Sequence, residues 1–302
     1  SDIDIKARMP GIGFNAKGSV AGLLGTVTPD LTATIDVATP LATKALGLPE
    51  DLVRGKGRVN LTIKGGIDNP RAVVQIDFGR GRINKTAISG INVYAGIEDR
   101  HVTLKKCRID LPAGTIPFGG DLDLSKTFPK GFTDAMAGLD TLAYTFLLNP
   151  DSLALNALEL GENTPKGKVA ARVRVQGQGV ALGQMYARAD LDVTVRDLIL
   201  PGMSGPAKVQ FKAGAKLERD SLMLTGLTLD GPGMTGAGAF RLNMPGFDSR
   251  KMTMTGNLDL DVADISVPLS LVGQKASGSA GVHAAVKGAL TAPDLTLDIT
   301  AG

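Results

Sequence analysis

The chain has 302 residues, of which 43% are hydrophobic, and its net charge is only +3. With no Trp, 3 Tyr and 9 Phe, its apolar mass is mainly aliphatic. This composition is too apolar for a disordered chain, and it lacks the dense basic stripe and interleaved aromatics typical of nucleic-acid binding. The single cysteine, Cys107, excludes an intramolecular disulfide, and we expect its thiol to be buried.

Alternation of apolar and polar residues recurs along most of the chain. In the segment Arg58–Lys64, Val59, Leu61 and Ile63 fall on one face, and polar residues fall on the other. Because successive side chains of a strand point to opposite faces, each such run predicts a strand with one apolar and one polar face. The same pattern returns at residues 169–176, 191–196, 209–217, 256–262 and 295–299. At about 15 residues per strand and turn, we expect about 18–20 strands.

Three segments interrupt the alternation and predict short helices. The first lies near 40–54, where Pro40 suits a first helical turn. The second lies within 126–164, where Thr133 could cap a helix with an apolar stripe of Met136, Leu139, Ala143, Phe146 and Leu147. The third and weakest is 264–272. Such helices would cover the apolar face as a lid, plug or end-seal, or pack over local core.

These interruptions divide the chain into three parts: strand repeats over 1–125 with the short helix near 40–54, a helix-containing insertion over 126–164, and strand repeats over 165–302. Degenerate similarity joins residues 91–124 to 209–243 and supports internal repetition. Both ends of the chain alternate like strands and show no polar capping unit. We therefore expect this sequence to be part of a longer repetitive protein.

Catalytic and metal-binding patterns are weak. His101 and His283 lie far apart in the sequence, and His101 should point to solvent, so we predict neither an acid–base pair nor enzymatic activity. Asp259, Asp261 and Asp264 could meet a cation, but they lack a glycine-centred calcium loop and are better explained as a solvated face. No phosphate loop, dinucleotide fingerprint or nucleophile elbow occurs, and we expect no cofactor or metal.

A basic cluster is the other charged feature, and it could meet lipid phosphates or an acidic partner at a rim. Its members are Arg80, Arg82, Lys85, Arg100, Lys105, Lys106 and Arg108. Ordinary placement on the polar strand face is the competing interpretation.

The turns between predicted strands carry a Gly-x-hydrophobic-x-x-Pro pattern, seen as Gly66-Ile67-Asp68-Asn69-Pro70 and again in Ala289-Leu290-Thr291-Ala292-Pro293. Together with the long glycine-rich meander and the leucine-bearing stretch before Gly55-Lys56-Gly57, this pattern resembles the AsmA-like superfamily of Gram-negative envelope proteins. The resemblance covers nearly the whole chain, except that 126–164 departs from a plain strand array.

The resemblance implies an all-β fold: an elongated, curved β-sheet (a β-taco) with a few short helices and an apolar groove. It also implies a periplasmic location, anchored to the inner membrane through a segment outside this sequence. Its implied role is lipid transport in outer-membrane biogenesis, with phospholipids as ligands and an outer-membrane Omp85-type barrel, similar to TamA, as a partner.

Aliphatic walls suit a hydrocarbon chain, which has no hydrogen bonds to satisfy, and each buried methylene contributes about 0.8 kcal/mol. We expect alternate apolar residues of the strands to line the lipid groove: Val59, Leu61, Ile63, Val74, Ile76, Phe78, Ile91, Val93, Val102, Leu104, Val173, Val175, Leu191, Val193, Val195, Val209, Phe211, Leu258, Leu260, Leu295 and Leu297.

Two other functions fit the same alternation. The chain could be a scaffold or chaperone that offers strand edges to outer-membrane barrels during their assembly. Alternatively, it could be a β-sandwich or β-solenoid adhesin, in which apolar faces pack on one another. Alternation alone does not separate a groove from a sandwich, because both have one dry face.

Overall fold

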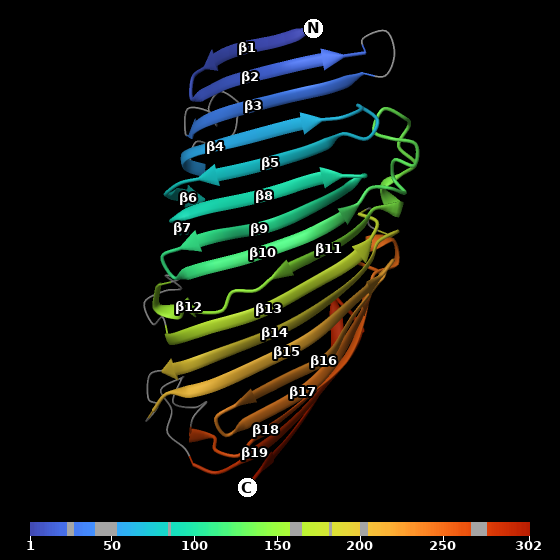
Figure 1. The fold of residues 1–302 in the computed structure, drawn as a ribbon. Coiled ribbons are helices and arrows are strands. Elements are labelled where there is room, and N and C mark those ends of the chain that lie inside the picture. The colour runs from blue at the N-terminus through green and yellow to red at the C-terminus, as the bar shows by residue number, and fades with distance from the viewer. Residues whose placement is uncertain are drawn as a thin grey trace. The chain divides into compact units, whose positions relative to one another are not determined.

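The structure, a computed structural model, describes residues 1–22, 27–39, 53–83, 86–157, 165–180, 183–199, 205–266 and 277–302. The described chain is all-β and contains 20 strands (Figure 1), which confirms the predicted fold class and strand number. Three 3-10 turns of three residues each, Leu139–Thr141, Leu155–Ala157 and Pro245–Phe247, interrupt the strands. The chain divides into two compact units, Ser1–Phe146 and Leu147–Gly302.

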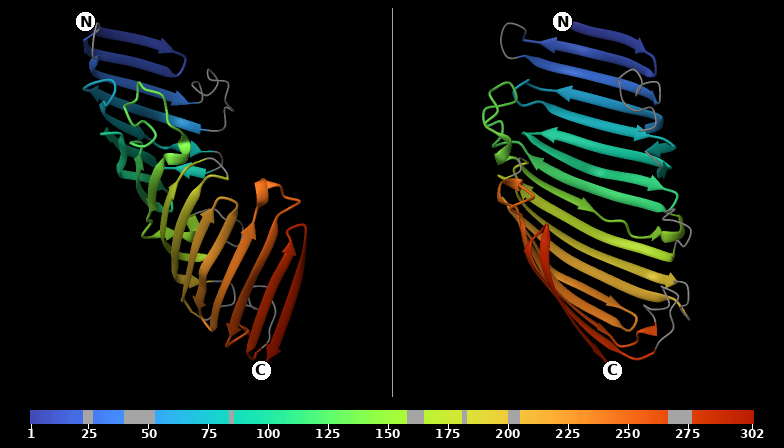
Figure 2. Two further views of the ribbon diagram at one scale, coloured as in Figure 1. Left: turned by 90° about the vertical axis from the view of Figure 1, so that its right-hand side faces the viewer. Right: turned by 180° about the vertical axis from the view of Figure 1, so that it is seen from behind.

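The first unit is an open antiparallel sheet whose long strands follow chain order (Figure 2). The short β6 and β7 form a side branch, because β6 pairs with the beginning of β4 while β5 pairs directly with β8. The strands are β1 (Asp2–Met9), β2 (Ile12–Ala21), β3 (Thr28–Thr39), β4 (Val53–Lys64), β5 (Arg71–Phe78), β6 (Gly81–Ile83), β7 (Thr86–Ile88), β8 (Gly90–Glu98), β9 (His101–Leu111) and β10 (Gly114–Asp123). Strand β11 (Ala143–Leu148) crosses the boundary between the units.

The second unit is also an open antiparallel sheet, and each strand from β13 to β20 pairs with the next one along the chain. Its strands are β12 (Leu153–Ala154), β13 (Lys166–Gln178), β14 (Tyr186–Ile199), β15 (Ala207–Glu218), β16 (Ser221–Gly231), β17 (Met234–Asn243), β18 (Thr253–Val262), β19 (Ala280–Ala289) and β20 (Ala292–Ala301). Every strand predicted from alternation lies inside one of the observed strands.

The two similar segments, 91–124 and 209–243, each fold into three consecutive antiparallel strands. In both meanders the first strand pair changes register once, which marks a β-bulge. The residue at the bulge has a positive φ in each case, 53° at Lys106 and 59° at Gly226. The repetition therefore includes a local backbone irregularity as well as the strand pattern.

The helix predicted after Thr133 is wrong, because this segment contains turns, a 3-10 turn and strand β11. Thr133 does not cap a helix, since its hydroxyl donates to the carboxylate of Asp68. Gly131 and Gly138 adopt φ values of 127° and 140°, which are incompatible with a helix. Beyond them, the run Ala143–Leu148 contains Tyr, Thr and Phe, which favour strand.

Side-chain contacts hold the loop after β10 in place. The Thr127 hydroxyl is completely buried and lies 3.3 Å from that of Thr141. Arg100 donates to the carbonyls of Phe128 and Pro129 at 2.9 and 2.6 Å. These polar contacts stabilise an irregular path that a helical stripe in the sequence does not reveal.

The other two helix predictions fall mainly on residues outside the described ranges. Of the segment 40–54, only residues 53 and 54 are described, and they begin strand β4 instead of ending a helix. Of 264–272, only residues 264–266 are described. The boundary between the two compact units falls inside the predicted insertion over 126–164.

Candidate apolar ligand-binding face

Strand register places apolar residues opposite apolar residues throughout the first unit. Ile35 of β3, Val59 of β4, Ile76 of β5 and Val93 of β8 are successive cross-strand partners. A neighbouring row joins Ala33, Leu61, Val74, Ala95 and Leu104. Directly paired residues of an antiparallel sheet project to the same side, so these rows form one surface, which we call the apolar face of the first unit.

The second unit has an apolar face built in the same way. One row crosses eight strands through Ala171, Val193, Phe211, Leu229, Gly236, Leu260, Val282 and Ile299. A parallel row pairs Val173 with Leu191, and another pairs Val195 with Val209. At the far end, Leu258 pairs with Ala284 and Ala284 with Leu297.

All the residues predicted to line a groove lie in described strands and, by register, on the apolar face of their own unit. None of them is fully buried, and most are partly exposed. On β20, Leu295 and Leu297 retain 70% and 53% of their surface. The predicted residues are thus brought together as two partly open aliphatic surfaces.

The alternation missed several residues of the same faces, including Phe14 and Ile35 in the first unit and Leu229 and Phe240 in the second. Residues 12–18 include Gly13, Ala16 and Gly18, whose small side chains make the difference in hydrophobicity between the two faces of this strand less evident in the sequence. Register supplies the missing information, because Phe14 pairs with Ile35 on the apolar face.

The opposite faces of both sheets are polar and carry cross-strand ion pairs. Arg58 lies 2.7 Å from Asp36, and Arg71 lies 3.1 Å from Glu98. The hydrogen bond and charge of Asp36 raise the pKa of Arg58. Such exposed pairs each contribute little to stability.

The two histidines lie in different units, and both side chains are 47% exposed, as expected for His101. His283 pairs with Asp259 at 2.5 Å, which raises the pKa of the imidazole and lowers the pKa of the carboxyl. Within the described ranges, no three His, Cys, Asp or Glu side chains group as metal ligands. Asp259 therefore belongs to a surface pair and not to a described metal cluster.

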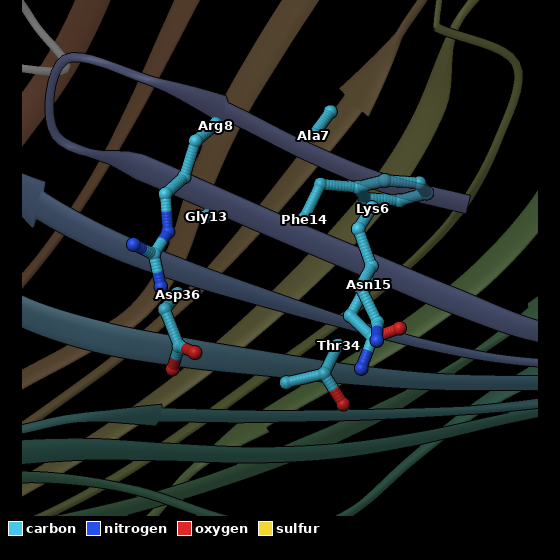
Figure 3. A pocket seen from close by; sticks show the side chains of 8 residues that line it. All are labelled: Lys6, Ala7, Arg8, Gly13, Phe14, Asn15, Thr34 and Asp36. Carbon is cyan, nitrogen blue, oxygen red and sulfur yellow. The ribbon is translucent and has the colours of Figure 1, made fainter. Parts of the chain in front are cut away.

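A polar depression of about 500 Å³ lies over β1, β2 and β3. By register Lys6, Asn15 and Thr34 form one row, and Arg8, Gly13 and Asp36 form the next. Figure 3 shows Arg8 extending toward Asp36, and Lys6 toward Asn15. Gly13 has no side chain to fill the space between its charged neighbours, and Ala7 and Phe14 complete the lining. This depression contains both signs of charge and does not extend the aliphatic rows.

The predicted basic cluster is only partly brought together. Arg80 and Arg82 line one cavity with Arg54. Arg100 binds the loop carbonyls at the opposite end of the strands, and Arg108 contacts Asn92 and Asp110 at 3.0 and 3.2 Å. Lys85 lies outside the described residues. The predicted burial of Cys107 is confirmed, since only 2% of its surface is exposed.

Comparison with protein-family models, curated proteins and solved structures gave no match. Among the described residues, no helix is both long and apolar enough to span a bilayer.

Proposed function

We propose that this chain is a lipid-transfer protein whose apolar faces hold the acyl chains of phospholipids. The observation that carries the proposal is the cross-strand pairing of apolar residues on one face of each sheet, with none of the predicted lining residues fully buried. In a β-sandwich the inner faces interdigitate and are buried, so partial exposure favours the groove over the sandwich.

The chemistry of the faces suits hydrocarbon. Each row is made of Val, Leu, Ile, Ala, Phe and Gly, so nothing in it would recognise a polar group. Contact with an acyl chain is driven by removal of apolar surface from water, at about 25 cal/mol per Å². Because this attraction is non-directional, neighbouring positions along a face hold a chain about equally well, which permits a lipid to slide.

The sequence resemblance extends the proposal to a cellular role. Within the AsmA-like superfamily the pattern is most similar to the translocation and assembly module protein TamB. We accordingly propose a periplasmic bridge between inner and outer membranes, with an outer-membrane Omp85-type barrel as a partner. A scaffold for barrel assembly is the alternative role, and it would use strand edges instead of the apolar faces.

The test is native mass spectrometry of the purified chain, followed by solvent extraction and lipid analysis. We expect co-purified phospholipid in the wild type and its loss in Val193→Asp, because a carboxylate would then lie in the apolar row between Ala171 and Phe211. Thr194→Asp is the matched control, since the adjacent residue faces the polar side, opposite Ala170 and Gln210.

Retention of lipid by Val193→Asp, or a lipid-free wild type, would contradict the proposal. Pull-down of a barrel precursor that survives the Val193→Asp substitution would support the scaffold instead. Circular dichroism of each variant establishes that it is folded before its lipid content is compared.

A further inference from the structure

Strand β1 is the outermost strand of the first unit, and its pairing partner is β2 (Figure 1). Ser1 and Val20 exchange two backbone hydrogen bonds, each of 2.9 Å. Because hydrogen-bonded pairs alternate along an antiparallel ladder, the odd-numbered residues of β1 bond to β2, and the even-numbered residues direct their N–H and C=O groups outward. The outer edge of β1 is therefore a row of backbone groups that have no partner among the described strands.

The outward-facing residues of β1 carry segregated charges. Asp2 and Asp4 occupy one half of the strand, and Lys6 and Arg8 occupy the other. All four side chains are exposed, and none of them forms an ion pair or a hydrogen bond with a residue that the structure describes. Their cross-strand neighbours on β2 include one charge, Lys17 opposite Asp4.

This charge pattern is complementary to itself. In an antiparallel pair of β1 with β1 of a second copy, outward-facing residues must meet outward-facing residues. If Asp4 meets Lys6 of the second copy, then Asp2 meets Arg8, and the two-fold axis repeats both ion pairs. A shift of two residues in either direction would place Asp4 opposite Asp4 or Lys6 opposite Lys6, which is unfavourable. The backbone and the charges thus select the same register.

The selected register also aligns the apolar side of β1. Ile5 meets Ile5 of the second copy at the axis, and Ile3 meets Ala7, since directly paired residues project to the same side. Ile5 retains 51% of its surface in the single chain, so the pairing would remove apolar surface from water. Across β2 and β3, Ile5 belongs to the apolar row that contains Leu61.

The polar depression over β1, β2 and β3 leaves Arg8 between two possible partners. Gly13 lies opposite Arg8 and has no side chain, and Asp36 beyond it pairs with Arg58 at 2.7 Å. Figure 3 shows Arg8 extending across this gap toward Asp36. Asp2 of a second copy would lie on the outer side of Arg8 and would extend the alternation of charges in this row beyond the edge.

We propose that β1 binds β1 of a second copy of this chain, antiparallel and about a two-fold axis at Ile5. The first units of the two copies then form one continuous sheet, with both apolar faces on the same side. Such a contact is isologous, which is the commonest kind of interface between identical chains. The inference is independent of the proposed lipid function, because it rests on backbone groups and charges at the edge of the sheet.

The first experiment is analytical ultracentrifugation of the 302-residue chain over a range of protein concentrations. We expect a monomer–dimer equilibrium that weakens as salt is raised, because the ion pairs are exposed. Asp2→Lys/Asp4→Lys and Lys6→Asp/Arg8→Asp should each weaken the dimer at least about tenfold, since every charged pair becomes a pair of like charges. An equimolar mixture of the two variants should dimerise again, because a basic strand then meets an acidic one.

Lys105→Asp/Lys106→Asp is the matched control, because it makes the same change of charge at two exposed lysines of β9, away from the edge. Its dimerisation should equal that of the wild type. Thermal unfolding of every variant is compared first. Recovery of the dimer in the mixture separates a lost interface from a lost fold.

Cysteine cross-linking tests the register. Ile5→Cys should form a disulfide between two copies under mild oxidation with copper phenanthroline, since the Cα atoms of a pair without hydrogen bonds lie about 4.5 Å apart. Ala7→Cys is the control, because residue 7 lies opposite Ile3 of the second copy and too far along the strand from residue 7. The native Cys107 is buried and does not compete.

Recovery of the dimer in the mixture, together with cross-linking at residue 5, would support the inference. A monomer at every concentration would overturn it. A dimer that both charge-reversed variants retain would also overturn it, since the contact would then lie on another surface. Equal cross-linking at residues 5 and 7 would contradict the register.

Discussion

Replacing Leu61 with Asp tests directly whether the apolar face is uncovered. Leu61 lies in the second half of β4, flanked on the same face by Ala33 of β3 and Val74 of β5, and its side chain is only partly buried. Complete burial of a leucine contributes about 1.5–3 kcal/mol, so partial burial corresponds to about 1–2 kcal/mol. The new carboxylate can keep its hydration on an open face, and we therefore expect the free energy of unfolding to fall by only that amount.

The same substitution inside a two-layer core would cost far more. There the loss of a large apolar side chain alone costs about 2–5 kcal/mol, and a buried, unpaired carboxylate adds several more. For a domain of this size, about 1–2 kcal/mol corresponds to a fall in Tm of about 2–8 °C. The free energy of unfolding and the Tm are measured by urea and thermal unfolding of the lipid-free protein, with circular dichroism as the signal.

Asn60→Asp provides the matched control, because it adds the same charge one residue away on the polar face. Asn60 accepts a hydrogen bond from the Thr34 hydroxyl, and a carboxylate can do the same. We expect this variant to change stability by less than about 0.5 kcal/mol. A loss above about 4 kcal/mol in Leu61→Asp, or a failure to fold, would refute the reasoning and show that another layer covers this face.

Two further predictions concern the polar face and a bulge. The raised pKa of His283 means that its pairing with Asp259 stabilises the fold fully below the ordinary histidine pKa, and this stabilisation is lost as pH rises through the folded-state value. The lowered pKa of Asp259 adds stabilisation above the ordinary carboxyl pKa that is lost in stronger acid. In His283→Gln, unfolding measured from pH 3 to 9 should therefore lose the histidine contribution and show a smaller acid slope, since Asn257 still donates to Asp259. Unchanged slopes would show that the pair does not titrate as described. Lys106 has a φ of 53°, so Lys106→Gly should leave stability unchanged or raise it by up to about 1 kcal/mol, whereas Lys105→Gly in the regular ladder should lower it. Equal losses in the two glycine variants, measured by urea unfolding, would contradict the bulge assignment.

The sequence predicted the strands well because their signal is local. Alternation alone identified the strand containing Val59 and Leu61, and the turn at Gly66–Pro70 does separate β4 from β5. The partners of a strand depend on contacts far along the chain. That β4 pairs with both β5 and β6 follows from residues outside its own pattern.

The segment after Thr133 shows why the helix prediction failed. Its apolar residues do fall at helical spacing, but spacing records only which side chains could share a face. The Thr133 hydroxyl instead donates to Asp68, which is 65 residues away in the chain, and Arg100 binds two carbonyls of the same loop. Tertiary hydrogen bonds of this kind leave no pattern in the local sequence. They can therefore override a weak helical preference without any sign of it in the sequence.

The cavity lined by Arg54, Arg80 and Arg82 shows the same limit. The sequence placed Arg80 and Arg82 in a broad basic cluster, but it did not connect them with Arg54, which register places opposite Arg82. It also grouped them with Arg100, which lies at the other end of the strands and supports a loop. Charge counted along the chain therefore grouped arginines that line one cavity with an arginine that supports a distant loop.

The polar and apolar faces of these sheets contribute differently to the register of the strands. A slip of one residue would move every apolar side chain to the polar side, so register must be specified strongly. A partly exposed aliphatic face specifies register less strongly than a fully buried core does, because its side chains pack against fewer neighbours. Cross-strand pairs on the polar face, such as Arg58 with Asp36 and Lys64 with Asp30, favour one register over its neighbours, and the bulge at Lys106 restricts it further. The polar face can therefore define the alignment of the strands, which leaves the apolar face free to remain uniform along its length, as a surface that binds hydrocarbon without recognising it requires.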